Sequence, residues 1–163
     1  MRKYTRKDYA SNDGMLTSIW GPGMWHYLHT VSFNYPVNPT DKDKNTYKKF
    51  IQNLGNTLPC KYCRINYRKN QQSHPILLKH LTNRNTFSRY VYNLHNVVNK
   101  LLHKPITLSY LDIKDRYEHF RARCNKTQKK CSTAYKGKKS KCILKIVPVS
   151  NNSKTFQVCT KKN

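Results

Sequence analysis

The sequence has no apolar run approaching the roughly 20 residues that a membrane-spanning helix needs. Its first 14 residues, MRKYTRKDYASNDG, lack the apolar stretch of a secretory signal. No internal repeat is evident along the 163 residues. These absences predict a protein with no membrane partner that stays in the compartment where it is made.

Acidic residues are also scarce, because 7 Asp and Glu stand against 32 Lys and Arg, for a formal net charge of +25. A field of that sign attracts nucleic acid, anionic membrane surfaces or acidic proteins without identifying the physiological partner. The alternative is that the lysines are only solvated surface charge in a Lys- and Asn-rich chain. A nucleic acid or acidic protein contact through the basic surface therefore stays open.

Length and composition fit one small domain with an appendage. A chain of 163 residues can bury a core, and 12% of the residues are aromatic. We expect a basic N-terminal extension at 1–14, a folded domain at 15–123 and a basic, cysteine-containing extension at 124–163. Two β-prone runs in that last segment, CILKIVPV and TFQVCT, predict a small β-hairpin.

The folded domain shows helical patterning. Apolar and aromatic residues recur at three- and four-residue steps in five segments, and prolines punctuate the connections between them. Thr40 or Asp41 is a suitable N-cap for the second helix, and Pro59 suits the first turn of the third. The predicted helices cover 20–35, 40 or 41 to at least 54, 59 onward, 86–102 and 109–124.

Two cysteines a helical turn apart, Cys60 and Cys63, follow Pro59. At a helix N-terminus the unpaired amides and the helix dipole favour a thiolate over a thiol. The neighbouring Lys61 and Arg64 act in the same direction. The first cysteine is therefore predicted to be a nucleophile suited to disulfide exchange.

Spacing alone leaves three further interpretations of this pair open. A zinc site needs about four ligands, and the remaining candidates, Cys124, Cys131, His74 and His80, are widely spaced. A structural disulfide between residues i and i+3 closes too small a loop to contribute much stability. A thioredoxin-like motif needs a βαβ context, whereas the flanking segments predict helices.

Four stretches follow one another in a recognisable order: WGPGMWHYLHTVSFNYP at 20–36, FIQNLGNTLPCKYC at 50–63, HNVVNKLLHKP at 95–105 and DRYEHF at 115–120. Together they resemble the Erv/ALR family of FAD-linked sulfhydryl oxidases. The resemblance implies an all-α fold, a four-helix bundle with a short fifth helix. It also implies noncovalent FAD beside the CxxC pair and electron flow from protein dithiols through FAD to O2, which gives hydrogen peroxide.

The same resemblance assigns roles to residues. It implies that Cys60 is the outer sulfur attacked by the substrate and that Cys63 faces the flavin. From the residues alone, ordinary helix packing is the alternative for Trp25, His29 and His95. The cofactor-binding residues that the resemblance implies are Trp20, Gly21, Trp25, His29, Cys63, His95, Asn96, Asn99, Lys104, Arg116 and Tyr117.

Four more cysteines lie at the start of the C-terminal extension and within it, where some members of the family keep a shuttle pair on a mobile tail. Cys124 and Cys131 are the candidate shuttle. Cys142 and Cys159 are the candidate structural disulfide, because a turn at 150–153 would bring them nearly opposite one another.

The Gly21-Pro22 pair departs from the Gly-Arg that the family usually has and is similar to members from large cytoplasmic DNA viruses. For a viral protein we expect the host cytoplasm, at the viral factory, or the virion. The resemblance to the family also implies a homodimer that acts on a dithiol-containing protein or shuttle. The rival hypothesis is a basic, cysteine-rich nucleic-acid-binding module with zinc at Cys60, Cys63 and two distal ligands.

Overall fold

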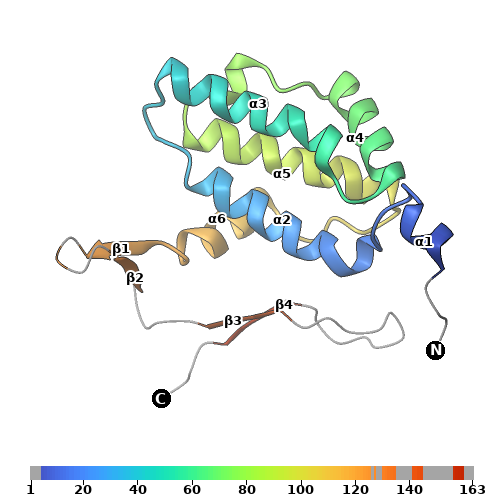
Figure 1. The fold of residues 1–163 in the computed structure, drawn as a ribbon. Coiled ribbons are helices and arrows are strands. Elements are labelled where there is room, and N and C mark those ends of the chain that lie inside the picture. Colours follow the sequence, from blue (N-terminus) through green and yellow to red (C-terminus); the bar gives the residue numbers. More distant parts are fainter. Residues whose placement is uncertain (1–4, 126, 128–129, 135–140, 145–155, 160–163) are drawn as a thin grey trace.

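The computed structural model describes residues 5–125, 127, 130–134, 141–144 and 156–159. Four helices form a bundle in which α2 packs on α5 and α3 packs on α4, while α6 contacts both α2 and α5 (Figure 1). The predicted bundle with a short fifth helix is confirmed. The helices are α1 (Arg6–Ala10), α2 (Thr17–Phe33), α3 (Asp41–Thr57), α4 (Lys61–Ser73), the 3-10 helix η1 (Leu78–Leu81), α5 (Arg84–Leu101) and α6 (Tyr110–Glu118).

Polar caps set where several of these helices begin. Thr40 caps α3, and its hydroxyl accepts a hydrogen bond from the N–H of Asp43 at 3.2 Å, while the Asp43 carboxylate accepts one from the N–H of Thr40. Ser109 and Asp112 make the same reciprocal pair before α6. Such capping boxes satisfy amide groups that the first helical turn leaves unpaired. Among the described residues, no helix combines the length and apolarity needed to cross a bilayer.

The core is aromatic as well as aliphatic. Buried tyrosines find partners for their hydroxyls, since Tyr35 donates to the carbonyl of Leu81 at 3.0 Å and Tyr67 to that of Ile51 at 2.8 Å. A buried hydroxyl without such a partner would be costly. The main cluster is Leu28, Tyr35, Ile51, Leu58, Tyr67, Ile76, Leu81, Phe87, Tyr90, Val91 and Leu94. A smaller cluster between α2 and α6 is Phe33, Tyr110 and Tyr117.

Short antiparallel strands follow the helical domain. Strand β1 (Ala122–Asn125) pairs with β2 (Lys130–Ala134), and β3 (Lys141–Leu144) pairs with β4 (Phe156–Cys159). The second pair occurs where the two β-prone runs were expected to meet, whereas the first pair was not anticipated. The predicted boundary between residues 123 and 124 falls inside β1, and the division into three segments stays a prediction.

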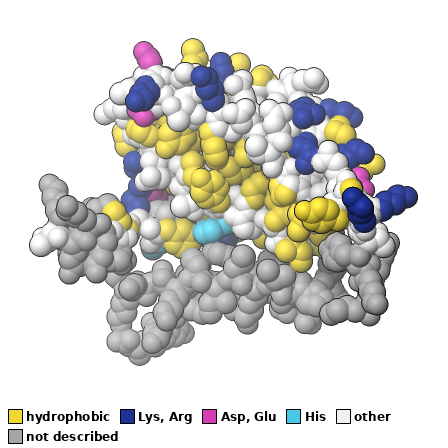
Figure 2. All heavy atoms as spheres, viewed as in Figure 1, with side chains coloured by type: hydrophobic (Ala, Val, Ile, Leu, Met, Phe, Trp, Pro, Cys, Tyr) yellow, Lys and Arg dark blue, Asp and Glu magenta, His cyan; other side chains and the backbone are white. Residues whose placement is uncertain are grey.

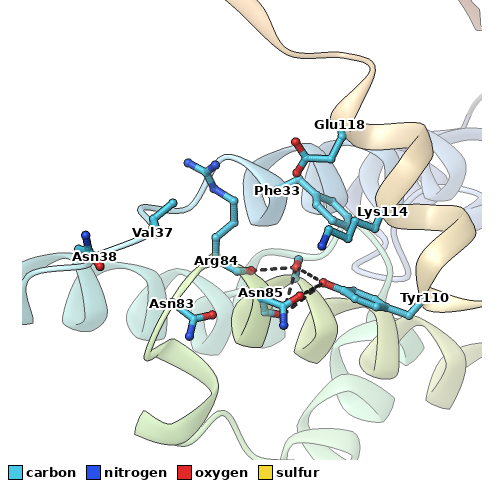
Figure 3. A pocket seen from close by; sticks show the side chains of 10 residues that line it. Phe33, Val37, Asn38, Asn83, Arg84, Asn85, Tyr110, Lys114 and Glu118 are labelled. Atoms are coloured by element: carbon cyan, nitrogen blue, oxygen red, sulfur yellow. Dashed lines mark hydrogen bonds between the residues drawn. The ribbon is translucent and has the colours of Figure 1, made fainter.

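A cavity of about 480 Å³ lies where α2 ends, α5 begins and α6 passes (Figure 3). The Tyr110 hydroxyl donates to the Asn85 side chain at 2.8 Å and lies 2.8 Å from the Ser88 hydroxyl. Arg84 donates to the carbonyl of Tyr35 at 2.6 Å. The Tyr110 hydrogen bonds attach α6 to α5 at this cavity, and none of the predicted site residues lines it.

Candidate active site

The two cysteines of the CxxC pair lie at the N-terminus of α4. Cys60 is the N-cap with an extended backbone (φ −151°, ψ 127°), and its sulfur accepts a hydrogen bond from the N–H of Cys63 at 3.2 Å. The sulfur thus satisfies one amide at the helix start. The prediction that Pro59 occupies the first turn of this helix was wrong. Pro59 precedes the helix because the backbone at Cys60 is extended.

Both thiols are free, and their pKa values shift in opposite directions. Desolvation raises the pKa of Cys60, but hydrogen bonds from the Cys63 thiol and N–H, from Thr17 and from the Tyr62 N–H lower it, and the net pKa is lowered. Desolvation raises the pKa of Cys63, and its hydrogen bond to Cys60 raises it further. In the reduced pair, Cys60 is therefore the sulfur that loses its proton more readily, and the Cys63 thiol is the donor in the hydrogen bond between the two side chains.

The two cations beside the pair act differently from the sequence-based expectation. Arg64 donates to the carbonyls of Leu58 at 2.7 Å and Asn12 at 3.4 Å, and Lys61 lies 3.8 Å from the carboxylate of Asp13. The lowered pKa of Cys60 comes from hydrogen bonds and not from these two cations. Arg64 instead attaches the N-terminal segment to the start of α4, and Lys61 adds only an exposed ion pair with that segment.

That N-terminal segment, residues 12–16, is hereafter called the strap. Gly14 forms an isolated antiparallel bridge with Cys60, and the strap's Met15 carbonyl accepts a hydrogen bond from the Trp20 indole at 3.1 Å. Thr17, the first residue of α2, places its hydroxyl 3.3 Å from the Cys63 sulfur. Sequence reasoning missed both contributions. The turn-forming run from Asn12 to Gly14 was the only available signal.

Packing of α2 against α5 brings Trp25, His29 and His95 together. The Trp25 and His95 rings stack with centroids 4.0 Å apart and planes 5° apart. His29 Nε2 lies 3.0 Å from His95 Nδ1, at hydrogen-bonding distance. Trp25 also packs against the main core cluster, as do Trp20 and Cys63. These predicted site residues therefore belong to one continuous region.

The histidine pair is held neutral. Burial, followed by the nearby His95 and His26, lowers the pKa of His29 to about 3. Burial, followed by Lys104, lowers the pKa of His95 to about 4. Within the described part of the chain, His29 Nδ1 is buried and has no hydrogen-bond partner, which costs about 1–3 kcal/mol unless another group supplies one.

The remaining predicted cofactor residues differ in burial and in their contacts. Tyr117 is buried, its hydroxyl lies 3.1 Å from His26 Nδ1, and its ring stacks on Phe33.

Asn99 and Asn96 share one long hydrogen bond of 3.4 Å between their half-buried amides. Arg116 and Lys104 are exposed. Gly21 is buried, but a side chain there would meet only the Thr17 methyl group at an ordinary 3.4 Å.

The tail cysteines occupy paired strands. Cys124 lies on β1 and Cys131 on the neighbouring β2, and Cys131 is disulfide-bonded. In the other hairpin Cys142 pairs with Val158, and Cys159 pairs with Lys141, one residue away from direct opposition. Neither the shuttle role nor the structural role is tested by this pairing, and both stay predictions.

The zinc hypothesis receives no support from the described part of the chain, where no group of three or more His, Cys, Asp or Glu side chains is arranged to hold a metal ion. Lys and Arg side chains on the face shown in Figure 2 lie in several separate places, and hydrophobic side chains gather over its middle. The described residues on this face therefore form no single basic patch for a nucleic acid.

The fold and the site define a helical bundle with a dithiol at a helix start and an aromatic and histidine cluster beside it. The sequence model of the Erv1 / Alr family matches residues 22–121. The chain belongs to this family.

Named relatives come from viruses and from cellular organisms. A probable FAD-linked sulfhydryl oxidase of Acanthamoeba polyphaga mimivirus is 38% identical over 80 residues, which cover 49% of this chain and 56% of that protein. A putative FAD-linked sulfhydryl oxidase of Invertebrate iridescent virus 6 is 33% identical, with 54% of this chain and 83% of that protein covered. The mitochondrial FAD-linked sulfhydryl oxidase of Saccharomyces cerevisiae is 32% identical over 52% of this chain and 43% of its own length.

Solved structures agree with the fold. The yeast Erv1 core superposes with a TM-score of 0.57 and 26% identity, covering 72% of this chain and 92% of that one. The FAD binding domain of Erv1 from the same yeast gives a TM-score of 0.57 and 28% identity, covering 63% of this chain and 94% of that one.

Proposed function

We propose that the protein is an FAD-dependent sulfhydryl oxidase. It oxidises protein dithiols to disulfides through Cys60 and Cys63 and passes the electrons through FAD to O2, which becomes hydrogen peroxide. The observation that supports this most directly is the dithiol at the start of α4, in which hydrogen bonds lower the pKa of Cys60 while that of Cys63 is raised. Family membership supports the same reaction.

The residues present fit FAD. Trp25 and His95 offer aromatic faces, and the orphaned His29 Nδ1 needs a polar partner that the described chain does not supply. The amides of Asn96 and Asn99, joined only by a long bond, retain capacity for a ring edge or a ribose. When bound, FAD supplies the two-electron acceptor and the reaction with oxygen, while the protein supplies binding and orientation.

The thiol chemistry follows from the two sulfurs. In the oxidised enzyme, a substrate thiolate attacks Cys60, the bond between Cys60 and Cys63 breaks, and Cys63 leaves as a thiolate. Thr17, 3.3 Å from the Cys63 sulfur, can donate a hydrogen bond to that thiolate.

The second thiol of the substrate then attacks the substrate sulfur in the mixed disulfide, and Cys60 leaves as a thiolate. A leaving thiol with a lowered pKa departs faster, so the hydrogen bonds on Cys60 assist this step. One substrate disulfide forms, and two electrons and two protons remain on the enzyme.

Purified full-length protein should be yellow, with absorbance near ~450 nm from bound flavin, and should consume oxygen when a dithiol is added. Spectrophotometry and an oxygen electrode measure both properties. A colourless protein that keeps its structure with a chelator present and consumes no oxygen would contradict the proposed function. Loss of structure to the chelator would favour the zinc alternative.

A relay through the tail is proposed for Cys124 and Cys131. Replacing both by serine should slow oxidation of a protein dithiol several-fold more than oxidation of dithiothreitol, because a small dithiol can reach Cys60 directly. Paired serine replacements of Cys142 and Cys159 serve as the matched control. Equal effects on the two substrates, or no effect on either, would remove the relay.

The wider setting is also proposed. The viral relatives support a viral protein in the host cytoplasm, at the viral factory, or in the virion. Family membership supports a homodimer, which sedimentation can test. Binding of the basic surface to nucleic acid should weaken steeply with salt, and binding that keeps its strength from low to moderate salt would argue against phosphate contacts.

A further inference from the structure

We propose that Gly14 is a positioning residue for the thiol exchange: only glycine lets the strap lie against Cys60 and hold its sulfur in the geometry used for attack and release. The inference rests on the proposed function, because that function makes Cys60 the sulfur that exchanges with substrate thiols. It concerns Gly14, which the sequence analysis assigned to the N-terminal extension, in a segment that precedes the family match at 22–121.

The strap and the start of α4 pair as a short piece of antiparallel sheet. The Met15 N–H donates to the carbonyl of Pro59 at 2.5 Å, and the Lys61 N–H donates to the carbonyl of Asp13 at 2.8 Å. Because these two bonds flank the bridge, Gly14 and Cys60 form the non-hydrogen-bonded kind of pair, in which the two backbones approach most closely.

This approach excludes a side chain at residue 14. Gly14 has φ +95°, a region that L-residues with a side chain rarely adopt. A Cβ there would lie 2.8 Å from the Cα of Cys60 and 2.9 Å from the carbonyl carbon of Pro59, and closer still to the Pro59 oxygen. All three are backbone atoms, which cannot rotate aside. Any other residue must therefore displace the strap.

Displacing the strap would affect Cys60 directly. The carbonyl of Asp13 satisfies the N–H of Lys61, the first residue of α4, while the Cys60 sulfur satisfies the N–H of Cys63. The bridge keeps Cys60 extended, which aims its sulfur at that amide. Without the bridge, Cys60 is free to change conformation, and its sulfur loses the hydrogen bonds that stabilise the thiolate.

The charged and titratable groups near Cys60 come from two elements. The strap contributes Asp13, and α4 contributes Lys61, Arg64 and Cys63, whereas α2 contributes the uncharged Thr17. Asp13 and Lys61 form an exposed pair 3.8 Å apart, and such pairs are weak in water. Loss of hydrogen bonds to the sulfur therefore outweighs any change in these charges when the strap moves.

The test compares the reactivity of Cys60 in reduced full-length protein. Rates of alkylation by iodoacetamide are followed by mass spectrometry across a pH series. Gly14→Ala should raise the apparent pKa of Cys60 by about one unit and slow its alkylation at neutral pH up to about tenfold. Alkylation needs neither flavin nor oxygen. A protein without oxidase activity would therefore overturn the proposed function, while its alkylation rates would still test the role of Gly14.

A second variant breaks the bridge in another way. Met15→Pro removes the N–H that donates to Pro59 without adding a side chain at Gly14, and it should shift the Cys60 profile in the same direction. Met15→Ala keeps the backbone and changes a side chain that is 68% exposed, so its profile should match the wild type. Asp13→Asn removes the charge and keeps the carbonyl, and it should also leave the profile in place.

Circular dichroism shows whether each variant keeps its helices. The inference fails if folded Gly14→Ala and Met15→Pro proteins titrate like the wild type. It also fails if Met15→Ala or Asp13→Asn shifts the profile as much as they do, because side chains or charge would then be responsible. If the Gly14→Ala protein does not fold, the test is the difference between the Cys60 alkylation profiles of Met15→Pro and Met15→Ala.

Discussion

Cys63→Ser should abolish turnover while leaving flavin binding intact. The serine hydroxyl can still donate a hydrogen bond to Cys60, but it cannot form the disulfide that a substrate thiolate opens. Oxygen consumption with dithiothreitol should therefore fall by at least roughly 1,000-fold, the scale seen when a residue that forms a covalent intermediate is removed. Cys142→Ser, a change in the tail, is the matched control and should retain the activity.

The same variant should capture a substrate. When a client protein is supplied in its oxidised form, the Cys60 thiolate attacks the client disulfide, one client sulfur is released as a thiol, and a mixed disulfide remains. In the wild-type protein the Cys63 thiol resolves this bond, so no adduct should accumulate there. Non-reducing electrophoresis and peptide mapping locate the adduct. In a variant that also lacks Cys124 and Cys131, the proposed relay pair, the absence of an adduct on Cys60 would contradict the assignment of the outer sulfur.

Acid should destabilise the fold well before the carboxylates titrate. The pKa values of His29 and His95 lie at about 3 and about 4, against an ordinary value of 6.5. As the pH falls below 6.5, these two histidines become protonated in the unfolded chain but stay neutral in the folded chain. The free energy of unfolding should therefore fall by about 1.4 kcal/mol per pH unit for each histidine, until the pH reaches its folded pKa.

Urea unfolding at fixed excess FAD, over the range from pH 6.5 down to about 4, measures this loss. His95→Phe keeps a ring on Trp25 and should remove a large part of the pH dependence. His119→Phe changes an exposed side chain next to the end of α6 and should preserve it. A free energy of unfolding that stays constant over the range would show that the two imidazoles are not held neutral by the fold.

Helices were predictable because their signals are local. The apolar spacing around Phe87, Val91 and Leu94 gives α5 one inward face, and Thr40 with Asp43 marks where α3 begins. The boundaries moved by a few residues at α2 and α5, and α6 ends at Glu118, earlier than the predicted 124, because β1 begins at Ala122. The apolar pattern alone does not define where a helix ends. The meeting of Trp25, His29 and His95 followed from the resemblance to a family and not from the helical pattern.

The strap was not predictable for the opposite reason. Gly14 and Cys60 are far apart in sequence, and their segments are joined by backbone N–H and C=O groups. Every residue type except proline has both groups. No side-chain pattern marks such a pairing. Thr17 is similar, since a threonine at a helix start has many ordinary uses and only the folded chain shows its hydroxyl beside the Cys63 sulfur.

Helix α2 carries Thr17 at the thiol end and His29 at the histidine cluster, and it fixes their separation. Twelve residues of continuous helix separate them by roughly 18 Å along its axis. One residue inserted between them would twist one end against the other by about 100° and disconnect the two halves of the site. Length variation in this protein should therefore be confined to the loops, such as the turn between Asn34 and Thr40, and α2 should behave as a fixed-length spacer.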